Sequence, residues 1–140
     1  SQSNRVVFMK AGINMGVRNP ILGVGYWGFR DNLSSYILDG DSATESKMTA
    51  HSSWILPFAE GGFVAFMSYI LLWSYGFFCA WQIRKSEPEY FMSLAGYAVT
   101  CTFLSHTYLL YPFILLGLVI THYQALKQNF ILGNGNEAMA

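Results

Sequence analysis

The chain has 140 residues, of which 53% are hydrophobic and 11% are charged, and its formal net charge is zero. Soluble domains carry roughly 25% charged residues, so this composition argues against a water-soluble globular protein. The balanced charge argues against nucleic-acid binding, whereas apolar runs of about 20 residues indicate helices that cross a membrane.

The first predicted element is a helix over residues 4–17. Four apolar side chains recur at helical spacing along one stripe of it, namely Val6, Met9, Ile13 and Val17. Arg18-Asn19-Pro20 ends the helix, because the residue before a proline avoids helical backbone angles. An amphipathic and modestly basic helix of this kind is suited to lying along a membrane surface.

A glycine-rich loop with large aromatic side chains follows over residues 21–29. Its Gly23-x-Gly25-x-x-Gly28 spacing matches the dinucleotide fingerprint by letters. No strand precedes it and no helical pattern follows it, so nucleotide binding is not expected. A tight turn explains the glycines, and an alternative is that they let backbone N–H groups approach a phosphate.

Residues 31–49 are polar and rich in turn-forming residues. Their acidic side chains lack the spacing of a calcium-binding EF-hand, so no metal site is expected. A capping box formed by Ser42 and Glu45 predicts a helix that carries His51. Pro57 would bend or restart that helix.

Three transmembrane helices are predicted next, over residues 61–82, 90–104 and 109–126. No charged residue occurs between Gly61 and Trp81. A polar turn at residues 84–89 separates the first two spans. The residues after Asn129 are expected to be disordered.

The predicted topology follows from Arg84 and Lys85, which lie in the short turn between the first two spans. Short basic turns favour the cytoplasmic side. Residues 1–60 then form an outer region, residues 61–126 the membrane part and residues 127–140 a cytoplasmic tail. Because no signal peptide is visible, we expect the chain to be the C-terminal part of a longer membrane protein.

Candidate catalytic and phosphate-binding residues lie before the first predicted span. An imidazole with a pKa of about 6.5 can take or give a proton at neutral pH, which makes His51 a candidate acid–base residue. An alternative of equal weight is that His51 lies at the membrane interface and hydrogen-bonds to water or to the backbone. Guanidinium groups pair bidentately with phosphate, so Arg5, Arg18 and Arg30 are candidate phosphate ligands, although such residues are usually solvated.

Other side chains are expected at the membrane surface, where they could contribute to a binding site. Glu60 begins the first span, where a carboxylate near a helix N-terminus contributes roughly 0.3–1 kcal/mol. Tyr26 and Trp27 are suited to stacking on sugar faces or to marking the bilayer edge. His106 is expected near the same outer surface, and His122 near the inner one.

The order of these residues resembles the C-terminal half of the O-antigen ligase/polymerase family of bacterial envelope glycosyltransferases. That family has an arginine with an amphipathic helix, then an asparagine–proline–glycine loop, then a histidine followed by leucine, glutamate and glycine before a span. The matching positions are Arg5, then Asn19, Pro20, Gly23, Gly25 and Phe29, then His51, Leu56, Glu60, Gly61 and Gly62. The resemblance covers nearly all of residues 5–125.

The resemblance implies an all-α integral membrane enzyme of the bacterial inner membrane, in which residues 1–60 are periplasmic. Its donor is a glycan on a polyprenyl diphosphate lipid, and its acceptor is a hydroxyl of another glycan or of the lipid A core. No metal or other cofactor is implied. We therefore expect two sets of site residues, the catalytic His51 and Arg5 and the substrate-binding Arg18, Arg30, Tyr26, Trp27 and Glu60.

The alternative to this enzyme is a non-catalytic membrane protein, either a scaffold subunit or a fragment of a transporter. Transporters place ionisable side chains near the middle of the bilayer, on broken helices. The predicted spans hold no acidic or basic side chain at that depth. This difference argues against transport, and it leaves the scaffold open.

Overall fold

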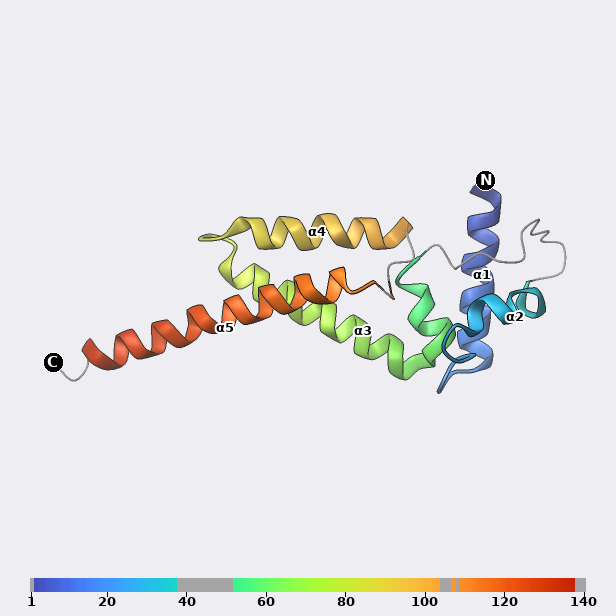
Figure 1. Ribbon diagram of the computed structural model, residues 1–140, viewed down its shortest axis with the longest axis horizontal. Helices are drawn as coiled ribbons and strands as arrows, with labels where there is room; N and C mark the ends of the chain where they lie inside the picture. The colour runs from blue at the N-terminus through green and yellow to red at the C-terminus, as the bar shows by residue number, and fades with distance from the viewer. Residues whose placement is uncertain (1, 38–51, 104–106, 108, 138–140) are drawn as a thin grey trace. The chain divides into compact units, whose positions relative to one another are not determined.

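The computed structural model describes residues 2–37, 52–103, 107 and 109–137. Over these ranges the chain is helical and contains no strand, as the sequence predicted (Figure 1). The helices are α1 (Gln2–Arg18), α2 (Gly28–Tyr36), α3 (Ile55–Ile83), α4 (Pro88–Phe103) and α5 (Tyr111–Glu137). The chain divides into two compact units, which are residues 1–71 with 98–109 and residues 72–97 with 110–140.

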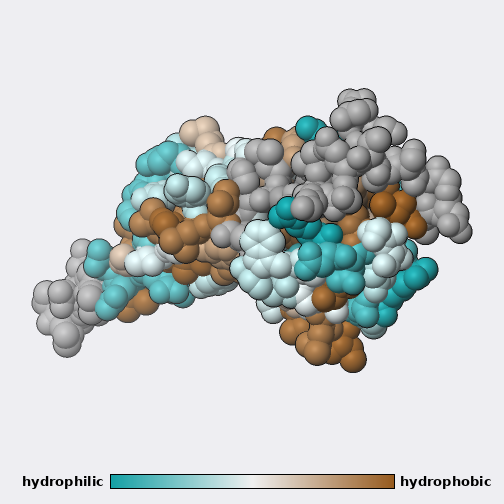
Figure 2. Space-filling model, turned by 45° about the vertical axis from the view of Figure 1, so that its right-hand side comes forward, coloured by the Kyte–Doolittle hydropathy of each residue, from teal (hydrophilic) through white to brown (hydrophobic). Residues whose placement is uncertain are grey.

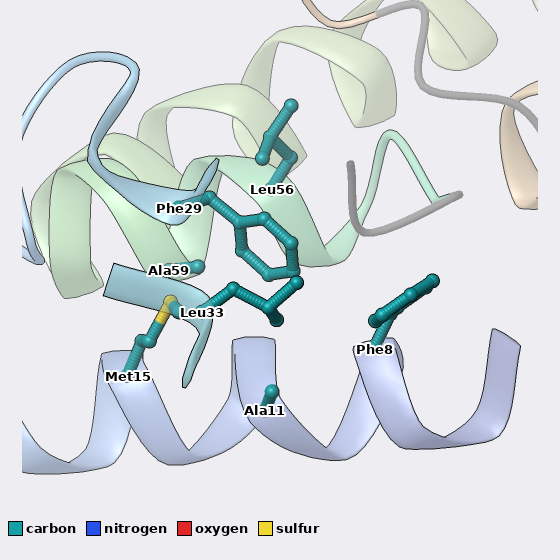
Figure 3. Close-up of a cluster of buried hydrophobic side chains, with 7 residues drawn as sticks. All are labelled: Phe8, Ala11, Met15, Phe29, Leu33, Leu56 and Ala59. Carbon is teal, nitrogen blue, oxygen red and sulfur yellow. The ribbon is translucent and has the colours of Figure 1, made fainter. Parts of the chain in front are cut away.

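The core of the first unit lies where α1 and α2 pack against the first turns of α3 (Figure 3). Seven buried side chains form it: Phe8, Ala11, Met15, Phe29, Leu33, Leu56 and Ala59. Burial of a large apolar side chain contributes roughly 1.5–3 kcal/mol, so this cluster is the main source of packing energy in the unit.

α1 is apolar on two sides. The stripe that the sequence predicted, from Val6 to Val17, is exposed, whereas the neighbouring stripe that includes Phe8 and Met15 is buried. The second stripe is the one that holds α1 to the rest of the unit. The exposed stripe is consistent with contact with a membrane surface, for which the sequence suggested this helix.

α3 is broken at Gly62, whose backbone angles are φ 64° and ψ −159°. Glycine adopts such a conformation without the steric cost that other residues incur. Figure 1 shows the ribbon of α3 changing direction in its early, green part. Of the two predicted effects of Pro57, the bend is not seen, whereas a helix does start at Ile55. Pro57 lies in its first turn, where a missing N–H removes no helical hydrogen bond.

Among the described helices, α3 alone is long and apolar enough to cross a membrane by length and composition. In its most apolar stretch, 33% of the residues are buried, which leaves most of that surface uncovered by the described chain. α4 has 16 residues, which give about 24 Å at roughly 1.5 Å per residue, less than the bilayer core of about 30 Å. One of the three predicted spans is therefore supported, and the three-span arrangement is not confirmed.

Two further elements differ from the prediction. α2 occupies residues 28–36, where the sequence predicted the end of a loop and a polar, turn-rich segment. α5 continues to Glu137, where disorder was predicted after Asn129. The helix predicted from the Ser42 capping box lies outside the described residues.

In the second unit, the C-terminal part of α3 lies against α4 through aromatic side chains. The ring centroid of Phe91 lies 5.9 Å from that of Phe77 and 5.5 Å from that of Trp81. His122 on α5 places its Nε2 atom 2.6 Å from Glu87 Oε2. The imidazole that was expected near the inner interface therefore lies beside the Glu87 carboxyl group.

Candidate functional site

The break in α3 is filled by the loop that joins α1 and α2. In a continuous helix the Ala59 carbonyl would accept a hydrogen bond from the Phe63 N–H. Here the Phe63 N–H donates to the Pro20 carbonyl at 2.7 Å, and the Ala59 carbonyl accepts from the Val24 N–H at 2.9 Å. The loop thus replaces both partners, and a buried backbone group without one would cost roughly 1–3 kcal/mol.

Glycines permit this close approach of two backbones. Gly25 donates its N–H to the Glu60 carbonyl at 2.9 Å. A Cβ atom on Gly23 would lie 2.6 Å from the same carbonyl oxygen, and one on Gly62 would lie 2.6 Å from the Ile21 carbonyl group. Any larger residue at these two positions would push the loop away from α3.

Asn19 anchors the loop where it leaves α1. Its side-chain amide donates to the Tyr36 hydroxyl at 2.9 Å and to the Met15 carbonyl at 3.2 Å. Its backbone carbonyl accepts from the Gly23 N–H at 2.9 Å. Tyr36 was not among the predicted site residues, because no local pattern shows that the end of α2 returns to α1.

These contacts bring together residues 19–29 and residues 59–63, and we term their contact the loop–break junction. Both stretches carry positions on which the family resemblance rests. The asparagine–proline–glycine loop and the glutamate–glycine pair are thus complementary halves of one backbone-paired structure. Sequence spacing alone gave no sign that they would meet.

The side chain of Glu60 joins the junction to α2. Glu60 is 7% exposed, and its Oε1 atom accepts a hydrogen bond from the Phe29 N–H at 3.0 Å, in the first turn of α2. Burial raises the pKa of the Glu60 carboxyl, and hydrogen bonds from the backbone N–H groups of Phe29 and Trp27 oppose that shift. Glu60 was predicted to bind substrate; in the structure its carboxyl is buried and one of its oxygens is hydrogen-bonded to α2.

The backbone N–H groups of the glycine-rich loop point at the protein itself. Those of Gly23, Val24 and Gly25 all donate to backbone carbonyl oxygens. They are not available to a phosphate, so the alternative in which these glycines cradle a phosphate is wrong for these donors. The tight-turn interpretation of the glycines is confirmed.

The predicted arginines do not form one cluster. Arg5 and Arg18 are both exposed on α1. Their separation, at roughly 1.5 Å per residue, places them about 20 Å apart along the helix axis, farther than one diphosphate reaches. The Arg18 guanidinium lies 5.6 Å from the centre of the Tyr36 ring. Arg30 is exposed in the first turn of α2, so Arg18 and Arg30 flank the loop at its two ends.

Tyr26 and Trp27 lie at the surface of the junction. They are 75% and 47% exposed, and their rings meet edge to face with centroids 6.0 Å apart. Trp27 has a left-handed backbone (φ 60°), which is uncommon for a residue other than glycine. Both rings have the exposure that stacking on a sugar or contact with a bilayer edge requires.

His51 and His106 lie outside the described residues, but their chain neighbours are described. The Ser53 N–H donates to the Cys101 carbonyl at 2.9 Å, and the Thr107 hydroxyl donates to the Ser53 carbonyl at 3.1 Å. The chain that follows His51 is therefore tied to the end of α4 and to the residue after His106.

Within the described residues, no group of three or more His, Cys, Asp or Glu side chains is arranged to hold a metal ion. No protein-family model matches the chain, and neither a curated protein nor a solved structure matches it. The function of the junction must therefore be inferred from its own geometry and chemistry.

Proposed function

We propose that this chain is part of a membrane glycosyltransferase of the O-antigen ligase/polymerase type, which transfers a glycan from a polyprenyl diphosphate lipid to an acceptor hydroxyl. The observation that carries the proposal is the loop–break junction. Positions that resemble the family fall on both halves of the junction and hydrogen-bond one another. A chance likeness of composition would not be expected to select residues that meet in this way.

In this proposal the segment of α3 after the break, residues 63–83, crosses the bacterial inner membrane as the first of three spans. At roughly 1.5 Å per residue it measures about 30 Å, which matches the bilayer core. Arg84 follows directly, and its guanidinium lies 3.6 Å from the centre of the Trp81 ring. Such pairs of a cation and an aromatic ring are typical of the edge of a bilayer.

The break at Gly62 then lies at the periplasmic face of the membrane. Irregular backbone at that depth is tolerated where protein groups satisfy its hydrogen bonds. The loop from α1 does so, and it places the outer region of the chain against the membrane surface. A donor whose diphosphate lies at the headgroups and whose tail is buried in lipid would meet this region.

The proposed reaction is a substitution at the anomeric carbon of the donor glycan. The acceptor oxygen attacks that carbon while the neutral imidazole of His51 takes its proton, which contributes about 10²–10⁴-fold to the rate. The bond from the anomeric carbon to the diphosphate oxygen breaks, and the diphosphate leaves with the electron pair. A guanidinium stabilises the negative charge that develops on the leaving group.

Because the arginines lie far apart, we assign them different roles. Arg5 and Arg18 lie too far apart to hold one diphosphate together. Arg5 is the proposed catalytic cation, whereas Arg18 and Arg30, beside the junction, bind the substrate. Tyr26 and Trp27 are proposed to contact the sugars or the headgroup layer.

The test is a transfer assay with a defined polyprenyl diphosphate-linked glycan and the complete coding sequence that carries this chain. His51→Ala should reduce transfer by at least about 10²-fold with unchanged expression, and Arg5→Ala should abolish it. Lys10→Ala, which also removes an exposed cation of α1, is the matched control and should retain activity. Wild-type transfer by His51→Ala would remove the assignment of the base.

A further inference from the structure

The outer tip of the loop–break junction is apolar and exposed. Ile21 and Leu22 are 70% and 75% exposed, and Phe63 and Val64, which follow the break, are 57% and 60% exposed. Figure 2 shows patches of hydrophobic surface, drawn in brown, next to hydrophilic surface, drawn in teal. Exposed apolar side chains gathered on a folded unit mark contact with another molecule or with a membrane.

A backbone contact brings the segments that carry these two pairs of side chains together. The Phe63 N–H donates to the carbonyl of Pro20, the neighbour of Ile21, at 2.7 Å. A bond of this length holds the tip of the loop beside the first residues of the apolar segment. Whatever medium surrounds Phe63 and Val64 therefore also reaches Ile21 and Leu22.

The composition of the loop favours lipid over a protein partner. No charged residue occurs over residues 19–29. Arg18 and Arg30 flank this stretch and are exposed, so their side chains can reach anionic headgroup phosphates while their stems lie along apolar surface. Tyr26 and Trp27, the exposed aromatic residues of the loop, are of the types enriched at membrane interfaces.

The backbone of the loop is also suited to a layer of low dielectric constant. In lipid, polar backbone groups must find partners within the protein. The N–H groups of Gly23, Val24 and Gly25 all donate to carbonyl oxygens of the chain. An ordinary surface loop, with its donors turned to water, would lose those hydrogen bonds on entering the membrane.

We infer that the tip of this loop is a membrane-inserted wedge, with Ile21 and Leu22 among phospholipid acyl chains at the depth of Phe63 and with Arg18 and Arg30 at the level of the phosphates. The inference rests on the proposed function in one respect, which is that α3 crosses a bilayer. The wedge holds the flanking arginines at a set height above the acyl chains. That height is the one at which the diphosphate of a lipid-borne donor lies.

The test measures the depth of nitroxide labels in vesicles of phosphatidylethanolamine and phosphatidylglycerol. The full chain, with Cys79 and Cys101 replaced by alanine, carries a single cysteine at Leu22, at Leu71 or at Ser34. Leu71 is 63% exposed on α3, and Ser34 is exposed on α2. Electron paramagnetic resonance then compares collisions of each label with oxygen, which concentrates in lipid, and with a water-soluble nickel chelate.

The wedge predicts that labels on Leu22→Cys and Leu71→Cys collide preferentially with oxygen, and that the label on Ser34→Cys collides preferentially with nickel. If Leu22→Cys behaves like Ser34→Cys while Leu71→Cys stays in lipid, the wedge is overturned and the proposed span survives. Nickel access at all three positions overturns the span as well. Oxygen preference at all three also contradicts the wedge, because the polar side of α2 would then lie in lipid.

A second label position protects this test against a variant that folds poorly. Ile21→Cys replaces a side chain that is 70% exposed, so it removes little packing. Its label should report the same medium as the label on Leu22→Cys. Water access at Ile21→Cys in a sample whose Leu71→Cys label lies in lipid would be sufficient to reject the wedge.

Discussion

Glu60 carries a buried carboxyl group within the loop–break junction. Burial raises the pKa of its carboxyl above the usual value of 4.5, even though the N–H groups of Phe29 and Trp27 favour the charged form. Between the usual and the raised pKa, the folded protein keeps a proton that the unfolded chain releases. The free energy of unfolding therefore falls as pH rises through this window.

Replacement of the Glu60 carboxyl should remove this pH dependence of the free energy of unfolding. In detergent, the melting temperature of the wild type should fall as pH rises from 4.5 through the raised pKa. Glu60→Gln should give a flatter profile over the same range. Asp31→Asn removes an exposed carboxyl of α2 and is the matched control for the loss of a carboxyl elsewhere in the chain. Equal slopes in Glu60→Gln and the wild type would show that the carboxyl does not titrate as described.

Gly62 is the residue on which the break depends. Its φ of 64° strains any residue with a side chain, and a Cβ atom would meet the Ile21 backbone at 2.6 Å. Gly62→Ala should therefore lower the free energy of unfolding by roughly 1–3 kcal/mol, measured by chemical denaturation in detergent. Gly117→Ala, on α5 with no atom within 4 Å of its added methyl group, should be neutral or stabilising by up to about 1 kcal/mol. Similar losses in both variants would argue against the break.

At the scale of secondary-structure elements, α1 is positioned on α3 by two glycines one turn apart. A Cβ atom on Gly12 would lie 2.6 Å from Ile55 Cγ2, and one on Gly16 would overlap the Phe58 ring. Small residues at this spacing let helices approach closely, which is a common contact between helices in membrane proteins.

A larger side chain at this contact should release α1. Gly16→Val is expected to raise the hydrogen-exchange rate of the α1 amides and to leave the α5 amides unchanged, as measured by mass spectrometry. Ile13→Ala, on the exposed side of α1, is the control and should leave both helices as in the wild type. Unchanged protection of α1 in Gly16→Val would mean that the helix is held by other contacts.

The boundaries of the elements could be predicted where local chemistry sets them. α3 ends at Ile83, one residue after its predicted end, where the Ser86 and Glu87 N–H groups bond to the Ile83 carbonyl in the predicted polar turn. The break in α3 could not be predicted, because it depends on a loop about forty residues earlier in the chain. α2 was missed for a similar reason, since the carboxylate in its first turn comes from Glu60 on another helix. The extension of α5 to Glu137 has no structural explanation here.

The sequence predicted which residues belong to the candidate site, but it did not predict how they contact one another. The family resemblance includes Pro20 and Glu60, and the structure ties their two stretches together, because the Pro20 carbonyl accepts from the Phe63 N–H and the Glu60 carbonyl accepts from the Gly25 N–H. Spacing could not show that Glu60 would be buried, whereas the helix predicted over residues 4–17 already placed Arg5 and Arg18 at its two ends. His51 lies outside the described residues, so its role stays a prediction.

At the scale of the whole molecule, the two ends of the apolar part of α3 are proposed to lie on opposite sides of a membrane. The outer region carries the proposed base and phosphate ligands, and it must face the periplasm to meet a lipid-linked glycan. The turn with Arg84 and Lys85 must then face the cytoplasm, as the distribution of basic residues favours. Every proposed role of a side chain depends on this orientation.

Thiol labelling in intact cells tests that orientation most directly. In a background without Cys79 and Cys101, single cysteines replace Ser34 and Lys85, which are both exposed. A membrane-impermeant maleimide should label Ser34→Cys in intact cells and Lys85→Cys only after the inner membrane is opened. Labelling of Lys85→Cys but not Ser34→Cys in intact cells would place the proposed site in the cytoplasm and contradict the account.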